Sequence, residues 1–433
     1  MFSSNPNDSH SQCIALIAYA QCPFWCLWAI SYIYIPANMR EFCPALTNKA
    51  YFNYGGQGPL PKPSLDAITA SWKRIQDLGP FTDNVWDYIS NEQRHTRQQL
   101  AELCGVSPHR LALSENVTSG CVVPLLGLPF EDGDRLLISD CEHPGVVAAC
   151  TELARRHHLL IDTLPVKLML AGAEEQHHTN SSVLEAVERF LRPSTRLVVL
   201  SHLLWNTGQI MPISSLAERL RQHKRQPFLL VDAAQSFGQL DVRDAAAAAD
   251  IYAFTGHKWA CGPEGLGGVA VSERLVCDSR PALIGWRSLR DGSQFNSDDP
   301  DPFHNDSRRF EVATSCVPLL AGLRASLDLL EHEGQPAVRL QRIRARSNAL
   351  WQVLEEISGV KTLLQGPPAA GIVSFTLRKR IDTGSIVQRL GAQGVWIRNL
   401  VDPDCLRACT HLCTTEAELI RLSTALASLI SGY

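Results

Sequence analysis

Residues 250–268 read Asp-Ile-Tyr-Ala-Phe-Thr-Gly-His-Lys-Trp-Ala-Cys-Gly-Pro-Glu-Gly-Leu-Gly-Gly, and this stretch organises the rest of the chain. The apolar run 251–254 predicts a buried strand that ends just before Lys258. A glycine-rich turn and a second apolar run, residues 269–271, follow it. A lysine beside a buried strand is costly as a charge unless it is paired, desolvated or used covalently, although most lysines simply extend into solvent. Lys258 is therefore a candidate for a chemical role that other parts of the chain must support.

Strand and helix patterns alternate on the amino-terminal side of this stretch. The apolar runs predict strands at 111–113, 134–140, 160–164, 197–200 and 227–232. Helical patterns lie around them at 63–75, 86–104, 146–157, 182–191 and 213–223. This alternation predicts an α/β fold with a mainly parallel sheet covered by helices on both faces. Ligands of such sheets bind beyond the carboxyl ends of the strands. The polar residues expected at that edge are Asn116, His143, Asn206, Asp232 and Lys258.

The carboxyl-terminal part of the chain has a different pattern. Residues 292–307 are polar and irregular, and helices are expected at 318–330, 337–357, 384–390 and 416–430. Strands are expected at 360–364, 372–377 and 395–398. We therefore expect a large domain at 61–310 and a smaller α+β domain at 311–433. Residues 39–60 are expected to be an amino-terminal segment that packs with the smaller domain. Residues 1–38 form an apolar amino-terminal extension in this interpretation.

Charge and cysteine content restrict the class of protein. There are 40 Lys and Arg residues against 44 Asp and Glu residues, a net charge of −4, which argues against a nucleic-acid partner. The 14 cysteines lack the paired short spacings of zinc ribbons, so we expect buried thiols in a reducing, cytoplasmic compartment. Residues 13–37 are nearly uncharged and long enough to cross a bilayer. However, no Lys or Arg precedes them, and Pro23 and Pro36 interrupt them, so membrane association is the less favoured interpretation.

Three features together point to pyridoxal phosphate. This cofactor needs a lysine for a Schiff base, a carboxylate beside its ring nitrogen and a helix amino terminus for its phosphate. Lys258 and Asp232 lie at the ends of successive predicted strands, and Thr118, Ser119 and Gly120 open a predicted helix. Each residue alone has a common structural explanation, such as a helix cap or a strand-end cap. Their combination predicts a pyridoxal phosphate site.

Several longer runs of the chain resemble the class V aminotransferase family, fold type I of the pyridoxal phosphate enzymes. The matching stretches are Val231–Gln235, Thr255–Lys258, Asn116–Gly120, Glu142–His143 and Ser201–Gly208. The chain is also similar to the L-cysteine/L-cystine carbon–sulfur lyases of that family. That similarity is carried by Tyr51–Gly58, Glu115–Cys121, Asp140–Gly145, Ser201–Gln209, Phe254–Trp259, Gly285–Ser288, Arg309–Ser315 and Asp402–Cys409. It extends from about Phe42 to the carboxyl terminus and implies a sheet of the seven-stranded type and a homodimer with active sites at the subunit interface.

The resemblance also implies roles for individual residues. Lys258 would carry the cofactor, Asp232 would pair with its ring nitrogen, and His143 would stack on the ring. The remaining cofactor-binding residues would be Gln235, His257, Thr118, Ser119, Asn206 and Thr314, the last donated to the partner subunit. Arg407 would bind the substrate carboxylate and Arg398 the second carboxylate of cystine, because a guanidinium fork matches a carboxylate. Asn53 and Trp286 complete the expected substrate-binding residues.

The reaction expected from this resemblance is β-elimination, with Lys258, His143 and Asp232 as catalytic residues. The freed Lys258 amine would take the Cα proton while the cofactor ring holds the carbanion. The Cβ–S bond then breaks, and L-cystine gives pyruvate, ammonia and cysteine persulfide, whereas L-cysteine gives sulfide. An iron–sulfur assembly protein is an expected acceptor of the sulfur.

Two alternatives remain open at this level. A cysteine desulfurase would need a nucleophilic thiol, for which the candidates are Cys405, Cys409 and Cys413, and would release alanine. A metal or iron–sulfur binding module could use Cys405, Cys409 and Cys413 on one helix face together with His411. We expect no metal site.

Overall fold

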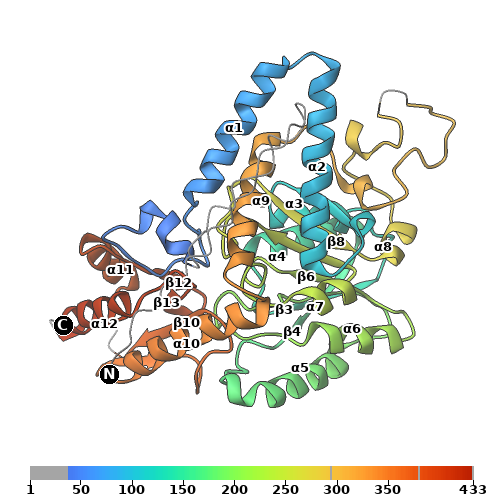
Figure 1. Cartoon of the computed structure of the whole chain (residues 1–433). Helices are drawn as coiled ribbons and strands as arrows, with labels where there is room; N and C mark the ends of the chain where they lie inside the picture. Colours follow the sequence, from blue (N-terminus) through green and yellow to red (C-terminus); the bar gives the residue numbers. More distant parts are fainter. Residues whose placement is uncertain (1–37, 293–294, 379–380, 432–433) are drawn as a thin grey trace, which may run out of the picture. The chain divides into compact units, whose positions relative to one another are not determined.

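A seven-stranded sheet forms the centre of the computed structural model, which describes residues 38–292, 295–378 and 381–431 (Figure 1). The sheet prediction is confirmed, and β8 is the strand that runs antiparallel to its neighbours β2 and β7. The carboxyl ends of the other strands therefore meet at one edge. In spatial order the strands are β2 (Leu111–Ser114), β8 (Gly267–Val271), β7 (Ile251–Thr255), β6 (Phe228–Asp232), β5 (Thr195–Val199), β3 (Arg135–Ser139) and β4 (Leu160–Leu164).

Both faces of this sheet are buried, because alternate side chains of a strand point to opposite faces. On β6, Phe228 and Leu230 belong to one hydrophobic core, and Leu229 and Val231 belong to another. The first core is covered by α3 (Val117–Leu125), α4 (Pro144–His157) and α8 (Glu273–Asp278). The second core is covered by α2 (Asp83–Cys104), α5 (Gln176–Phe190), α6 (Ile213–Gln222), α7 (Arg243–Ala248) and α9 (Val317–His332).

Helix α1 (Lys62–Leu78) packs closely on α9, and α2 lies beside both (Figure 1). Gly322 of α9 allows this approach, since a Cβ there would lie 2.5 Å from Ile68 Cγ1. Helix α9 thus packs on helices from the amino-terminal half of the chain, although it follows the boundary predicted at residue 310. That boundary, like the one at residue 60, remains a prediction.

The carboxyl-terminal part contains a separate antiparallel sheet, as the α+β pattern predicted. Its strand order is β12 (Arg398–Val401), β13 (Asp404–Cys409), β10 (Ile372–Leu377) and β9 (Val360–Thr362). A third hydrophobic core joins this sheet to α10 (Pro336–Glu355), α11 (Thr383–Ala392) and α12 (Glu416–Ser431). The single strand predicted at 395–398 is wrong. The chain changes sheets at Ile397, between β11 (Val395–Trp396) and β12.

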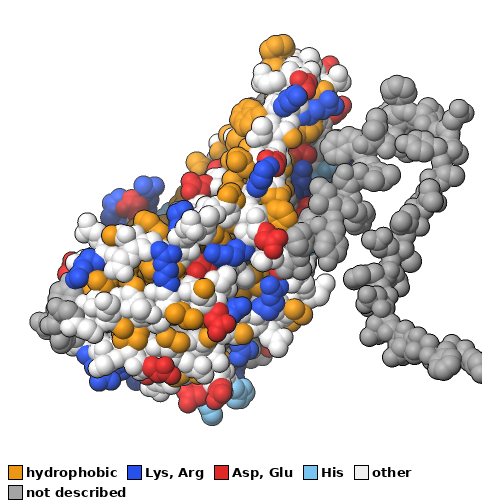
Figure 2. Space-filling view, turned by 60° about the vertical axis from the view of Figure 1, so that its left-hand side comes forward, with side chains coloured by type: hydrophobic (Ala, Val, Ile, Leu, Met, Phe, Trp, Pro, Cys, Tyr) orange, Lys and Arg blue, Asp and Glu red, His pale blue; other side chains and the backbone are white. Residues whose placement is uncertain are grey.

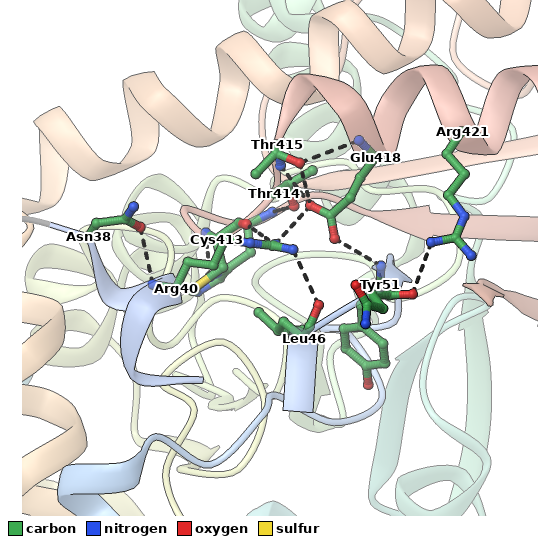
Figure 3. Close-up of polar contacts among 11 residues, drawn as sticks. Asn38, Arg40, Leu46, Tyr51, Cys413, Thr414, Thr415, Glu418 and Arg421 are labelled. Carbon is green, nitrogen blue, oxygen red and sulfur yellow. Dashed lines mark hydrogen bonds and ion pairs between the residues drawn. The ribbon is translucent and has the colours of Figure 1, made fainter. Parts of the chain in front are cut away.

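The amino-terminal segment is attached to the carboxyl-terminal sheet and helix (Figure 3). Strand β1 (Ala50–Tyr51) pairs in parallel with β11. The half-buried Arg40 donates hydrogen bonds to the Cys413 carbonyl (2.6 Å) and to Glu418 of α12 (2.9 Å). Glu418 also accepts a hydrogen bond from the Tyr51 backbone N–H. A buried carboxylate with a cation and several N–H and O–H donors is well compensated, so this network fixes the segment to α12 and to the residues before it.

No helix among the described residues is long and apolar enough to cross a membrane. Residues 13–37, for which membrane association was considered, lie outside the described residues.

Candidate active site

A cavity of about 200 Å³ opens at the carboxyl ends of the parallel strands. Seven of the residues predicted from the sequence border it or lie at its floor, and they come from four different strand ends. Its lining consists of Asn116, Val117, Thr118, His143, Ser201, Leu203, Trp205, Asp232, Ala234, Gln235, His257 and Lys258. Convergent polar groups in a partly apolar cavity are typical of a cofactor site.

Lys258 lies three residues beyond β7, with its side chain in this cavity. Burial lowers the pKa of its amine to about 8, although the carboxylate of Asp232 favours the charged form and the guanidinium groups of Arg407 and Arg398 oppose it. A large fraction of the amine is therefore neutral near pH 8. A neutral amine is what both covalent attachment to an aldehyde and proton abstraction require.

The glycine-rich loop of residues 55–58 supports the Lys258 backbone. The Gly58 N–H donates to the His257 carbonyl at 2.7 Å. A Cβ at Gly58 would lie 2.1 Å from the Lys258 carbonyl oxygen, so no larger residue fits without a backbone shift. A Cβ at Gly55 would lie 2.9 Å from Gln235 Oε1 and 3.1 Å from Arg407 Cζ. Gly55 and Gly58 thus allow the backbone of this loop to lie directly against Lys258, Gln235 and Arg407.

Asp232 and Gln235 occupy the floor of the cavity, and both are buried. Asp232 Oδ1 accepts a hydrogen bond from the Ala234 N–H at 2.8 Å. The Gln235 amide is held on both sides, since Oε1 accepts from Trp259 Nε1 and Nε2 donates to the Gly55 carbonyl, each at 2.9 Å. The fixed carboxylate suits a cationic ring nitrogen, and the second N–H of Gln235 can donate to a ring oxygen.

The amino terminus of α3 forms one wall. Asn116 caps the helix by accepting the Ser119 N–H at 2.9 Å, while Val117 and Thr118 face the cavity. Ser119 is half-buried and is not part of the lining. His257 is nearby, and its Nδ1 is 2.7 Å from Thr255 Oγ1. Free N–H groups at a helix start, with adjacent hydroxyl and imidazole groups, fit a phosphate.

His143 caps α4, where its Nδ1 accepts the Gly145 N–H at 3.2 Å. Burial lowers its pKa, which favours the neutral ring. Its ring meets that of Trp205 edge-on, with 5.8 Å between centroids. Trp205 was not singled out from the sequence, although the stretch that contains it was. Its Nε1 is buried without a hydrogen-bond partner in the described protein.

Glu142, next to His143, is buried and accepts hydrogen bonds from Ser139 and from both the N–H and the hydroxyl of Ser201. Burial raises the pKa of this carboxyl group to about 7. Glu142 therefore ties the end of β3 to the residue after β5, beneath the cavity. From the sequence, Glu142 was noted only as the neighbour of His143, and no role was predicted for it.

Two of the predicted residues, Asn206 and Asn53, do not line the cavity. Asn206 is buried, and its side chain accepts the Thr207 N–H at 3.0 Å and donates to the Asp402 carbonyl at 3.4 Å. Asn53 is half-buried beside the glycine loop, and its Oδ1 has no hydrogen-bond partner in the described protein. Their roles toward cofactor and substrate remain predictions.

Arg407 is fully buried on β13, and its Nη1 donates to the Trp205 carbonyl at 2.8 Å. Its Nε has no hydrogen-bond partner in the described protein. Arg398 on β12 lies directly opposite Arg407 and is exposed. Both guanidinium groups disfavour protonation of Lys258 and His143, so the two cations lie near the cavity.

Trp286 and Thr314 are not part of this cavity. Both are exposed, Trp286 in the short helix η5 (Trp286–Ser288) and Thr314 just before α9. The structure describes a single chain, in which neither residue reaches Lys258. The prediction that Thr314 serves the partner subunit stays a prediction, as does substrate binding by Trp286.

The cavity residues fit pyridoxal phosphate. They provide a lysine with a lowered pKa, a buried carboxylate and a helix amino terminus, and buried polar atoms of Trp205, Asn53 and Arg407 lack protein partners. Residues 67–430 match the family model of class V aminotransferases. The chain belongs to the class V aminotransferase family. The matched residues cover both sheets and every cavity residue, so the predicted family is confirmed.

Solved structures of one protein, C-DES, are similar over most of both chains. A complex described as the cystine C–S lyase C-DES with its reaction product cysteine persulfide is 39% identical, with a TM-score of 0.82, covering 89% of this chain and 99% of that chain. A lysine-to-alanine mutant of C-DES has glycine covalently linked to its pyridoxal phosphate cofactor and is also 39% identical, with a TM-score of 0.83 and coverage of 90% and 98%. This chain is accordingly a pyridoxal phosphate-dependent enzyme.

Curated relatives have other activities. Isopenicillin N epimerase of Amycolatopsis lactamdurans is 29% identical over 416 residues, covering 91% of this chain and 98% of that protein. A probable cysteine desulfurase of Methanothermobacter thermautotrophicus is 24% identical over 341 residues, covering 78% of this chain and 81% of that protein. The family therefore contains both carbon–sulfur chemistry and epimerisation, and the choice between them depends on the site.

Proposed function

We propose that this enzyme is a carbon–sulfur lyase that acts on L-cystine, and on L-cysteine more slowly, by β-elimination. The observation that carries the proposal is the position of Lys258, with its lowered pKa, in a cavity whose lining includes no cysteine among the described residues. The buried Arg407 lies outside this lining but near enough for its charge to act on Lys258. The 39% identity to the cystine lyase C-DES supports the same reaction.

The residues that would hold the cofactor are Lys258, Asp232, Gln235, His143 and the start of α3 with His257. When bound, pyridoxal phosphate supplies an electron sink for the carbanion next to the substrate amino group. Asp232, whose Oδ1 is fixed by the Ala234 N–H, would pair its carboxylate with the ring nitrogen. His143, whose lowered pKa favours the neutral ring, would stack on the cofactor ring without adding charge.

The substrate would be oriented by its carboxylate. Arg407 is held in place by its bond to the Trp205 carbonyl and retains an unpartnered Nε for that carboxylate. The neutral Lys258 amine then takes the Cα proton. Breaking the Cβ–S bond of cystine releases cysteine persulfide. The three-carbon remainder takes up one water and leaves as pyruvate and ammonia, so that cystine plus water is balanced by the three products.

The burial of all three candidate thiols, Cys405, Cys409 and Cys413, disfavours a desulfurase. Burial raises the pKa of Cys405 to about 12, so it is not a thiolate at neutral pH. The exposed cysteines among the described residues, Cys277 and Cys316, do not line the cavity. The metal-binding alternative placed Cys405, Cys409 and Cys413 on one helix face. Cys405 and Cys409 lie on strand β13, so this helix face does not exist and the alternative is wrong. The described residues contain no cluster of three or more potential ligands.

A homodimer completes the proposal. The exposed Thr314 would serve the partner's site, and apolar side chains are available for an interface on α1 and α2. Figure 2 shows hydrophobic side chains gathered along these helices. Trp72 of α1 is 49% exposed, Trp86 of α2 is 53% exposed, and Phe81, in the turn between the two helices, is 88% exposed. Large apolar side chains that are exposed close together are typical of a protein–protein interface.

A product assay with the purified holoenzyme tests the reaction. Cystine should give pyruvate and ammonia in equal amounts, with persulfide detected by alkylation and mass spectrometry. Alanine as the product would establish a desulfurase, and D-configured or meso-cystine without pyruvate would establish an epimerase. Lys258→Ala should abolish pyruvate formation. Retention of that activity would refute the assignment of the base.

A further inference from the structure

A second, larger cavity of about 510 Å³ lies between α2 and residues 286–292 and 304–311. It shares no lining residue with the cofactor cavity. It borders the short helix η3 (Pro108–Arg110), which leads into the amino-terminal end of β2, whereas the cofactor cavity lies at the carboxyl ends of the strands. It is therefore not an extension of the active site within this chain.

The walls of this cavity are rich in arginine. Five arginines border it, from α2, η5 and the residues around them, but its only carboxylates among the described residues are Asp306 and Glu311. Arg97 pairs with Glu311 at 2.6 Å, and Arg308 pairs with Asp306 at 2.8 Å. Arg290 pairs with Asp299, outside the lining, at 2.8 Å.

Arg94 and Arg287 remain without a carboxylate partner among the described residues. Arg94 Nη2 donates to the neutral Asn91 side chain at 2.7 Å. The Arg287 guanidinium lies 4.7 Å from the centre of the Trp286 ring, and its Nε is buried without a hydrogen-bond partner. Arg287 is half-buried, and the carboxylate whose charge favours its protonated form, Glu311, is already paired with Arg97. A bound anion would compensate the positive charge that remains.

We propose that this cavity binds a small molecule carrying two or more phosphate or carboxylate groups. Arg287 and Arg94 would hold its anionic groups, because a guanidinium fork matches two oxygens of either group. Trp286 would form an apolar side of the site. The volume is in the range of small-ligand sites, so the ligand is a metabolite-sized polyanion rather than a protein segment. This inference does not depend on the reaction that the enzyme catalyses.

Equilibrium binding to the holoenzyme tests the site, because the bound cofactor already fills the phosphate-binding start of α3. Pyrophosphate and citrate would be titrated separately by isothermal titration calorimetry at low ionic strength. One site per chain is expected for at least one probe, and the preferred probe identifies a phosphate or a carboxylate ligand. Arg287→Met should weaken binding about tenfold or more, since it removes one of the two guanidinium groups proposed to hold the anion. Arg287→Lys should recover part of the loss.

Arg94→Met is the second variant, and its exposed side chain makes misfolding no concern. Arg219→Met is the matched control, since Arg219 is a surface arginine of α6 paired with Glu188. It should leave the affinity unchanged. Binding of neither probe to the wild type would overturn the proposal. An affinity unaffected by both Arg287→Met and Arg94→Met, or one lost in Arg407→Met instead, would also overturn it.

Discussion

Arg398 and Arg407 face each other directly across the antiparallel pair of β12 and β13. Like charges at directly opposed positions destabilise a sheet. The proposed substrate supplies the compensation, since cystine carries two carboxylates and cysteine carries one. This arrangement gives the two arginines separable roles.

Arg398→Met should raise the KM for cystine about tenfold, or about 1.4 kcal/mol, and leave the KM for cysteine nearly unchanged. The second carboxylate loses its partner, while Arg407 still holds the first. Steady-state kinetics of pyruvate formation with both substrates provide the measurement. An equal rise for both substrates would show that Arg398 does not discriminate between them.

Attachment of pyridoxal phosphate to the cofactor-free protein should depend on pH through Lys258. Burial lowers the pKa of this amine from its ordinary 10.5 to about 8. The neutral fraction therefore rises about tenfold per pH unit below pH 8 and levels off above it. Borohydride trapping followed by peptide mass spectrometry gives the rate at Lys258. A rate that keeps rising up to pH 10 would contradict the lowered pKa.

Glu142 should make the protein less stable as pH rises. Burial raises its pKa to about 7 from an ordinary 4.5, so the folded state retains a proton that the unfolded state has released between these values. The resulting loss of stability develops between pH 4.5 and 7 and is complete above about pH 7, at up to about 3 kcal/mol.

Glu142→Gln should flatten this dependence, since glutamine cannot ionise. Urea unfolding of both proteins at pH 5 and pH 7.5 measures it. If both proteins lost the same stability between these pH values, another group would be responsible.

Gly58→Ala should destabilise the protein by about 2 to 3 kcal/mol, because the added Cβ overlaps the Lys258 carbonyl. It should also weaken cofactor retention, seen as a lower visible absorbance after gel filtration. Gly384→Ala is the control, since its Cβ would meet its nearest neighbour, Asp382 Oδ1, at an ordinary 3.5 Å. Equal effects of both substitutions would rule out a specific role for the loop.

Replacing Phe81 and Trp86 by serine should convert the proposed dimer into a monomer with reduced activity. Their exposed rings would lose most of the apolar contact that drives association. Light scattering coupled to gel filtration measures the mass. Leu168→Ser, at a side chain that is 87% exposed and far from α1 in sequence, is the control.

Local patterns predicted the sheet well, because both of its faces are buried. Strands β4 and β10 have the predicted bounds, and the strand ends bring Lys258, Asp232 and His143 together as expected. Helix α5 begins six residues earlier than predicted, since its first turns are polar and carry no apolar periodicity. Residues 395–398 could not be divided from the sequence, because the division depends on pairing with β1, more than 300 residues away.

The candidate site was predictable where a motif follows a strand. The roles of Trp205 and Gly58 depend on contacts between distant segments, which no local pattern contains. The arginine-rich cavity could not be predicted for the same reason, because its residues come from α2 and from a part of the chain about 200 residues later.

The pairing of β1 with β11 and of Arg40 with Glu418 has a consequence for biosynthesis. A ribosome completes the seven-stranded sheet long before it has made β11, β13 and α12. Arg40 and β1 are made early, but they cannot form these contacts until β11 and α12 have been made. Arg407 is thus positioned only after β12 and β13 have been made, and a product truncated before them would retain Lys258 but not the arginine proposed to bind the substrate carboxylate.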